Sequence, residues 1–225
     1  MPARPLRSLV GALAFCMTAG AANAVTFVGF QNGLNAGESL ATTFEGGPTL
    51  GDATFLLSGF SLGGSATLYT GSLTNITAAP ATSTTTRDTT QYLSVQRGQT
   101  ATLDTPLLQA ISFYVGSLDG FNRFTFHLAD GSTQFFTGAM LSALPATDAN
   151  GDQTGFTTNG RLTFSFLSPI DSVMFASSGN ALEVSDIGIL PSLSLVPEPA
   201  AWALMILGFG GVGGVARARR AMRLA

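Results

Sequence analysis

Apolar and polar residues alternate along much of the stretch between residues 25 and 196. In the segment 122–128, Phe124, Phe126 and Leu128 occupy every second position, and the segment 161–166 has the same pattern. A period of two is typical of β-strands that bury one face and expose the other. The same criterion predicts further strands at 25–30, 53–60, 65–70, 91–96, 100–104, 111–115, 132–136, 173–175 and 181–189.

Turn-forming dipeptides separate the predicted strands, at Gly63-Gly64, Asp119-Gly120, Asp130-Gly131 and Asn150-Gly151. We find no amphipathic helical stretch of useful length between 25 and 196. Many short strands joined by glycine-containing turns predict an all-β domain, a β-sandwich with a jelly-roll-like order of strands. Its numerous phenylalanines would supply most of the core.

The last predicted strand breaks its own alternation. Leu182 and Val184 share one parity, whereas Ile187 and Ile189 share the other. A β-bulge near Asp186 would return both pairs to the same face. Because a bulge often re-aims a neighbouring side chain, Asp186 becomes a candidate functional residue.

Residues 1–24 have the features of a secretory signal peptide. Two arginines precede a short apolar run, and Ala22 and Ala24 form the small-residue cleavage pattern. The apolar run is too short to span a bilayer as a helix. We therefore expect cleavage after Ala24, with Val25 as the mature N-terminus; an uncleaved N-terminal anchor is the alternative.

The opposite end, residues 197–225, has three parts in series. A Pro-Glu-Pro tripeptide at 197–199 precedes an apolar run at 200–216, and an arginine-rich tail follows at 217–223. The length of the apolar run is at the lower limit for a transmembrane helix. The arginines beyond it obey the positive-inside rule, so the tail would lie in the cytoplasm and residues 25–196 outside it.

This ending resembles the PEP-CTERM sorting signal of Gram-negative bacteria, in its PEP-x-x-W-A form. The residues that carry the resemblance are Pro197, Glu198, Pro199, Trp202, Gly208, Gly210, Arg217, Arg219 and Arg220. The resemblance implies recognition by exosortase, a membrane enzyme that processes its substrates near the PEP motif. It also implies export by the secretion machinery, transient anchoring in the membrane, and a role at the cell surface in exopolysaccharide and biofilm.

Charge separates the chain into two kinds of segment. The whole chain has a net charge of −3 and only 10% charged residues, against about 25% in an ordinary domain. Residues 25–196 carry four arginines and twelve carboxylates, a net charge of −8, and the chain has no lysine. Nucleic-acid binding needs a basic surface, so this class of function is excluded.

The chain is poor in the residues that carry catalysis and zinc binding. Its only histidine is His127, and its only cysteine, Cys16, lies in the predicted signal peptide. A nucleophilic triad needs a base, and a zinc site needs several His or Cys ligands. We therefore predict that the protein is not an enzyme, although a glycosidase with two carboxylates stays formally open.

Calcium is the one metal for which candidate ligands exist, and no other cofactor is expected. Asp148, Asn150 and Asp152 have the spacing of the first ligands of an EF-hand loop. Positions 6 and 12 of that loop do not match, and a hairpin connection explains the segment equally well. Glu183 and Asp186 form an alternative carboxylate site for a structural calcium ion.

Two internal segments are similar to segments of other exosortase-dependent surface proteins. Residues 113–122 resemble an F-x-x-G-S-x-D-x-x-N pattern, and residues 178–187 resemble an S-G-N-A-F-E-x-D-N-I ending. Here Leu182 replaces the phenylalanine, and the order Asp-Asn is absent. These departures weaken any transfer of ligand-binding residues.

The predicted function is that of an exported, non-enzymatic protein of the cell surface or extracellular matrix. The alternative is a carbohydrate-binding or adhesive module, which would need exposed aromatic residues. Tyr114 has the outward parity of its strand and is the best aromatic candidate, with Asp119 and Asn122 beside it in the sequence. An open groove lined by these three residues would favour glycan binding.

Overall fold

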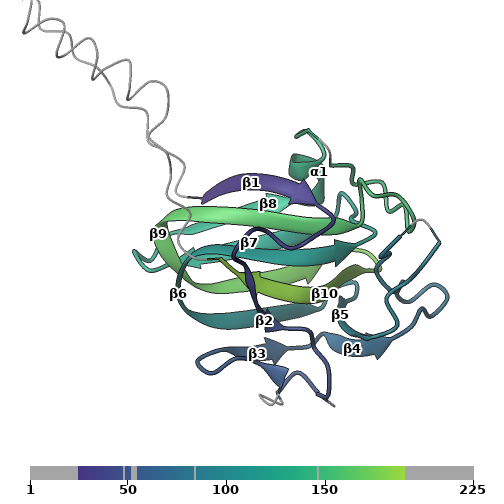
Figure 1. Cartoon of the computed structure of the whole chain (residues 1–225), viewed down its shortest axis with the longest axis horizontal. Helices are drawn as coiled ribbons and strands as arrows, with labels where there is room; N and C mark the ends of the chain where they lie inside the picture. Colours follow the sequence, from purple (N-terminus) through teal and green to yellow (C-terminus); the bar gives the residue numbers. More distant parts are fainter. Residues whose placement is uncertain (1–24, 48, 52–54, 84, 146, 191–225) are drawn as a thin grey trace, which may run out of the picture.

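The computed structural model describes residues 25–190, apart from residues 48, 52–54, 84 and 146. Its regular secondary structure is almost entirely β-strand, and the all-β prediction is confirmed (Figure 1). The strands are β1 (Val25–Gln31), β2 (Ser39–Thr42), β3 (Ser61–Gly64), β4 (Thr67–Thr70), β5 (Gln91–Val95), β6 (Thr100–Gly116), β7 (Asn122–Leu128), β8 (Thr133–Thr137), β9 (Gly160–Ser177) and β10 (Leu182–Ile189). A short helix, α1 (Gly138–Leu141), follows β8.

Within the described residues, no helix is long and apolar enough to cross a membrane. The predicted signal peptide at 1–24 and the predicted transmembrane run at 200–216 lie outside those residues. Both stay predictions from the sequence.

The ten strands form one antiparallel sheet that folds over itself. Its main path runs β4-β5-β10-β6-β9-β7-β8, with β1 added to β9, β2 to β10 and β3 to β6. The two longest strands, β6 and β9, pair with each other on both sides of a break in register near Leu108. The first half of β9 also pairs with β1 and its second half with β7, so one strand serves two layers.

Phenylalanines between the two layers form the centre of the core. Phe113 on β6 stacks on Phe124 of β7 at 5.1 Å and meets Phe175 of β9 edge-on at 5.2 Å. Phe164 of β9 lies 4.8 Å from Phe126 of β7. All five rings are fully buried. Because the partners belong to opposite layers, these contacts give the fold its sandwich-like form.

Most of the predicted strands are present, and the bulge is present too. β10 pairs with β6 through Val184 and then through Asp186, so Ser185 is the extra residue. Ile187 therefore returns to the core beside Val184, as the broken alternation predicted.

Three features of the strand pattern differ from the prediction. The described residues of the predicted strand at 53–60 form turns, and β2 and β3 were not predicted. Both β2 and β3 have only four residues. Alternation over four residues is too short a signal to distinguish a strand from a loop.

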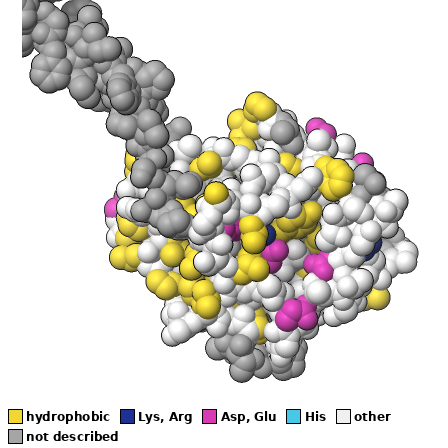
Figure 2. Space-filling view, viewed as in Figure 1, with side chains coloured by type: hydrophobic (Ala, Val, Ile, Leu, Met, Phe, Trp, Pro, Cys, Tyr) yellow, Lys and Arg dark blue, Asp and Glu magenta, His cyan; other side chains and the backbone are white. Residues whose placement is uncertain are grey.

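The outer face of the layer formed by β6, β9 and β10 is polar but largely covered. Arg161 on β9 is buried and pairs with Glu38 at 3.0 Å and with Asp186 on β10. Its guanidinium also donates to the Ser112 hydroxyl at 2.9 Å. The remaining surface is mostly uncharged and polar in the view of Figure 2, consistent with the small fraction of charged residues.

Candidate functional site

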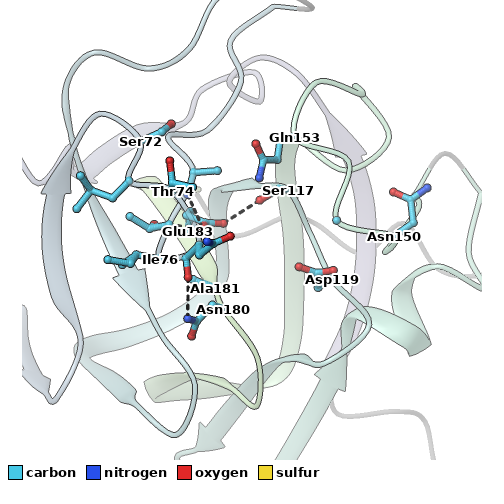
Figure 3. A pocket seen from close by; sticks show the side chains of 15 residues that line it. Ser72, Thr74, Ile76, Ser117, Asp119, Asn150, Gln153, Asn180, Ala181 and Glu183 are labelled. Carbon is cyan, nitrogen blue, oxygen red and sulfur yellow. Dashed lines mark hydrogen bonds between the residues drawn. The ribbon is translucent and has the colours of Figure 1, made fainter.

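A pocket opens where β6 ends and β10 begins. These strands pair through Gly116 and Glu183, which places the residues after Gly116 beside the residues before Glu183. The pocket has a volume of about 650 Å³, within the range of about 300–1,000 Å³ that is usual for small-molecule sites. Its lining comes from residues 72–78, Ser117, Asp119, Asn150, Gly151, Gln153, Asn180, Ala181 and Glu183 (Figure 3).

The two segments singled out by resemblance meet in this pocket. The segment 113–122 contributes Ser117 and Asp119, and the segment 178–187 contributes Asn180 and Glu183. Their sequence separation gave no indication that they lie together. The antiparallel pairing of β6 with β10 brings them into contact.

Glu183 holds one wall of the pocket in place. It is 1% exposed, and its Oε1 accepts hydrogen bonds from the Ala78 amide at 3.0 Å and the Thr77 hydroxyl at 3.1 Å. Its Oε2 accepts a hydrogen bond from the Ser117 hydroxyl at 3.0 Å. Burial raises the pKa of Glu183 to about 7, although these hydrogen bonds oppose the shift.

Asp119 lies in a different environment in the same pocket. It is half-buried, and no hydrogen bond or ion pair among the described residues ends on its carboxylate. Burial raises the pKa of Asp119 above its ordinary value. Gly151 permits this arrangement, because its φ is +73° and a Cβ there would lie 2.5 Å from Asp119 Oδ1.

Asn159 joins the loops that surround the pocket. It is fully buried, and its Oδ1 accepts hydrogen bonds from the Ser117 and Ala81 amides, both at 3.0 Å. Its Nδ2 donates to the carbonyls of Asp152 at 2.9 Å and Gly155 at 3.0 Å. One side chain thus fixes three separate segments of chain relative to one another.

Several polar side chains in the pocket have no partner among the described residues. Thr74 and Gln153 are exposed, and their side chains form no hydrogen bond within the described part of the chain. The Asn150 Oδ1 accepts from the Asp152 amide, which leaves its Nδ2 available. Leu73 and Ile76 add exposed apolar surface to the rim. Such a mixture of hydroxyl, amide, carboxylate and apolar groups can bind a polyhydroxylated ligand.

Backbone strain is found at this pocket. Two residues of its lining, Asn75 and Ser117, have positive φ angles of 61° and 40° without being glycine. Serine and asparagine adopt such angles at some cost, and strained residues concentrate at functional sites. The strain agrees with a functional use of the pocket.

Of the three predicted ligand-binding residues, Asp119 alone lines this pocket. Tyr114 does lie on the outer face, but it is 7% exposed and its hydroxyl donates to the Ala81 carbonyl at 2.6 Å. Asn122 is fully buried; its Oδ1 accepts from the Asp119 amide, and its Nδ2 donates to Ser177 Oγ at 3.2 Å. The expected groove of three residues is therefore not formed, because a covering loop occupies the outer face at Tyr114.

The candidate calcium ligands are not gathered around one point. Within the described residues, there is no group of three or more His, Cys, Asp and Glu side chains that could hold a metal. Asp152 accepts from the amide and hydroxyl of Thr154, both at 2.8 Å, so it stabilises a local turn. Asp148 is exposed in the same connection, which leads from α1 to β9. The hairpin alternative is not observed either, because the described residues of this connection form no strand.

Glu183 and Asp186 also lie apart. Glu183 lines the pocket described above, whereas Asp186 pairs with Arg161 and lines a second, smaller pocket together with Tyr114 and Asp88. The bulge at Ser185 separates the two carboxylates along β10. They do not form the shared carboxylate site that their spacing suggested.

The predicted sorting residues lie outside the described part of the chain. This holds for the cleavage residues Ala22 and Ala24 and for Pro197, Glu198, Pro199, Trp202, Gly208, Gly210, Arg217, Arg219 and Arg220. Their roles stay predictions.

Sequence comparisons give no match, either to a family model or to a curated protein. Among solved structures, the chain is similar to the catalytic unit of a thermostable GH87 α-1,3-glucanase from Streptomyces thermodiastaticus. The identity is 14%, the TM-score is 0.30, and the match covers 61% of this chain and 26% of the glucanase chain. This chain thus spans about a quarter of that structure, and so low a TM-score supports no conclusion about activity.

Proposed function

We propose that the protein is an exported surface protein whose β domain binds carbohydrate through the pocket between β6 and β10. One observation carries the proposal. Hydroxyl, amide and carboxylate groups from four separate segments converge on one cavity, and several of them have no partner among the described residues. Sugar hydroxyls both donate and accept hydrogen bonds, so they satisfy this mixed set of groups.

The sequence supports the location outside the cell. An N-terminal export signal and a C-terminal sorting signal would place residues 25–196 in the extracellular polymer layer. The resemblance to that sorting signal implies a role in exopolysaccharide, so polysaccharide is the ligand class that we propose. This part of the proposal rests on the resemblance of residues 197–223 to the PEP-CTERM signal.

The pocket favours binding over hydrolysis. A general acid must reach the glycosidic oxygen, whereas both oxygens of Glu183 accept hydrogen bonds from the protein and its side chain is buried. Asp119 is accessible to a ligand, but a second accessible carboxylate is absent from the lining given above. We therefore assign the protein a binding role and no catalytic one.

The test is retention of the full chain on an insoluble neutral polysaccharide, with a variant that fills the pocket. Thr74→Trp places a large side chain at an exposed position of the lining, and we expect retention to fall about tenfold or more, because a filled pocket loses its hydrogen bonds to the ligand.

Thr133→Trp on strand β8 is the matched control, since Thr133 is also exposed and does not line the pocket. Equal retention of both variants would exclude the pocket as the binding site.

A further inference from the structure

Charge in the pocket is one-sided. Asp119 and Glu183 are both part of the lining, whereas none of the described lining residues is an arginine, and the chain has no lysine. An anionic ligand such as a uronic acid would meet repulsion from the Asp119 carboxylate, and nothing in this lining offsets it. The pocket is therefore suited to neutral or cationic ligands.

The two carboxylates differ in what they still require. Glu183 accepts three hydrogen bonds from the protein, so both of its oxygens already have partners. Asp119 has lost part of its hydration and gains no hydrogen bond or ion pair from the described residues in return. Partial burial of a carboxylate without a hydrogen-bond partner raises the free energy of the folded protein. A ligand that donates a hydrogen bond to this carboxylate would offset that desolvation penalty.

An ammonium group fits this requirement better than a hydroxyl. A hydroxyl offers one donor without charge, whereas a protonated amine offers three donors and the opposite charge. The neutral groups that share the lining with Asp119, the amides of Asn150 and Gln153 and the hydroxyl of Thr74, suit the hydroxyls of the same ligand.

We infer that the pocket is selective for saccharides that carry a free amine, with the ammonium group bound by Asp119. This inference rests on the proposed carbohydrate-binding function and names the class of sugar. It predicts a preference for de-N-acetylated hexosamine chains over their N-acetylated forms, and rejection of uronic acid chains.

Calorimetric titration of the full chain tests the preference. The probes are the β-1,4-linked tetramers of glucosamine and N-acetylglucosamine and a tetramer of galacturonate, at about pH 6, where an amine of ordinary basicity is protonated. A chelator present throughout excludes bridging by metal ions. We expect the glucosamine tetramer to bind about tenfold more tightly than the acetylated tetramer, because a charge-assisted hydrogen bond replaces a neutral one.

The variant Asp119→Asn keeps the shape of the side chain and removes its charge. We expect it to lower affinity for the glucosamine tetramer to that of the acetylated tetramer, and to leave the latter within about twofold. Asp171→Asn is the matched control, since Asp171 is an exposed carboxylate on β9 outside the pocket.

Salt provides a readout that needs no variant. Binding of the glucosamine tetramer should weaken between about 0.05 M and 0.5 M sodium chloride, whereas binding of the acetylated tetramer should change little.

Four results would count against the inference or the function on which it rests. Equal affinity for the two tetramers, or no effect of Asp119→Asn with a normal melting curve, would refute the ammonium site while leaving carbohydrate binding intact. Equal binding of cadaverine, a diamine without a sugar, would show that the saccharide contributes nothing. Binding of none of the probes, together with no retention on any polysaccharide, would refute the proposed function itself.

Discussion

Glu183 and Asp119 show how two carboxylates of one pocket acquire different roles from their surroundings. Glu183 is enclosed by residues 77–78 and Ser117, whose donors hold it in one position. Asp119 faces the cavity with its oxygens unoccupied by the described residues. The first is a structural group that connects a loop to the sheet, and the second is the group available to a ligand.

The raised pKa of Glu183 has a consequence for stability. Its pKa is about 7 in the folded chain against an ordinary 4.5, so between these values the folded state holds a proton that the unfolded state has released. The stabilisation is fully present below pH 4.5 and is lost as the pH rises through about 7. We expect a loss on the order of 3 kcal/mol from this residue.

The variant Glu183→Gln isolates this effect because glutamine has the same shape and does not titrate. Urea unfolding at a series of pH values should show a free energy of unfolding that falls less steeply from about pH 5 to pH 8 than in the parent chain. Glu45→Gln removes an exposed carboxylate and should leave the slope unchanged. An unchanged slope in Glu183→Gln would contradict the buried environment of Glu183.

At the residue scale, the sequence predicted two of the pocket's important side chains, but it grouped each of them with a residue that does not line this pocket. Asp119 was a candidate beside Tyr114, and Glu183 was a candidate beside Asp186. Parity along a strand predicted which face Tyr114 occupies, but it cannot predict that a loop covers that face. Thr74 and Gln153 were missed because they lie in loops without any pattern that indicates a site.

At the scale of elements, the pocket depends on where two strands end and on how the loops between strands are fixed. The pairing of β6 with β10 sets the position of Ser117 beside Glu183. Asn159, the residue before β9, then connects Ser117 to the loops that contain Ala81 and Asp152 through hydrogen bonds. The loops are thus positioned by buried hydrogen bonds rather than by regular structure.

The variant Asn159→Ala should destabilise the fold and loosen the pocket. It leaves the amides of Ser117 and Ala81 buried without an acceptor, and we expect a loss on the order of 3 kcal/mol in urea unfolding. Carbohydrate affinity should fall as well, because Gln153 loses its fixed position. Asn32→Ala, at an exposed site, is the control and should unfold like the parent chain; equal stability of both variants would refute the positioning role.

The strands themselves follow from the sequence where the alternation is long. The break in apolar alternation within the predicted strand 181–189 correctly predicted a bulge, which lies at Ser185. β2 and β3 were missed because four residues carry too little pattern, and their pairing with β10 and β6 is a tertiary effect. The merging of 100–104 with 111–115 into the single strand β6 is another such effect, since both parts pair with β9.

At the scale of the whole molecule, the domain has a sandwich-like core of phenylalanines and a surface with few charges. β6 and β9 each contribute one half to each layer, so the same two strands link the two layers of the sandwich. The low charge of the chain is a property of this domain, and in Figure 2 most of the face in view is neither charged nor hydrophobic.

The sorting proposal makes a prediction about the chain as the cell produces it. In cells with an active exosortase, the mature protein should end near Pro199 and lack the arginines at 217–223. Mass spectrometry of the C-terminus, in fractions from cells with and without the enzyme, measures this directly. Retention of the arginine tail in exosortase-positive cells would refute the sorting proposal without affecting the pocket.

A crystal structure of the protein soaked with the glucosamine tetramer tests the central claim most directly. We expect a sugar ring in the pocket between β6 and β10, with its amine within hydrogen-bond distance of Asp119 and a hydroxyl at Thr74 or Gln153. An empty pocket at saturating ligand, or a sugar bound on another face of the domain, would contradict it.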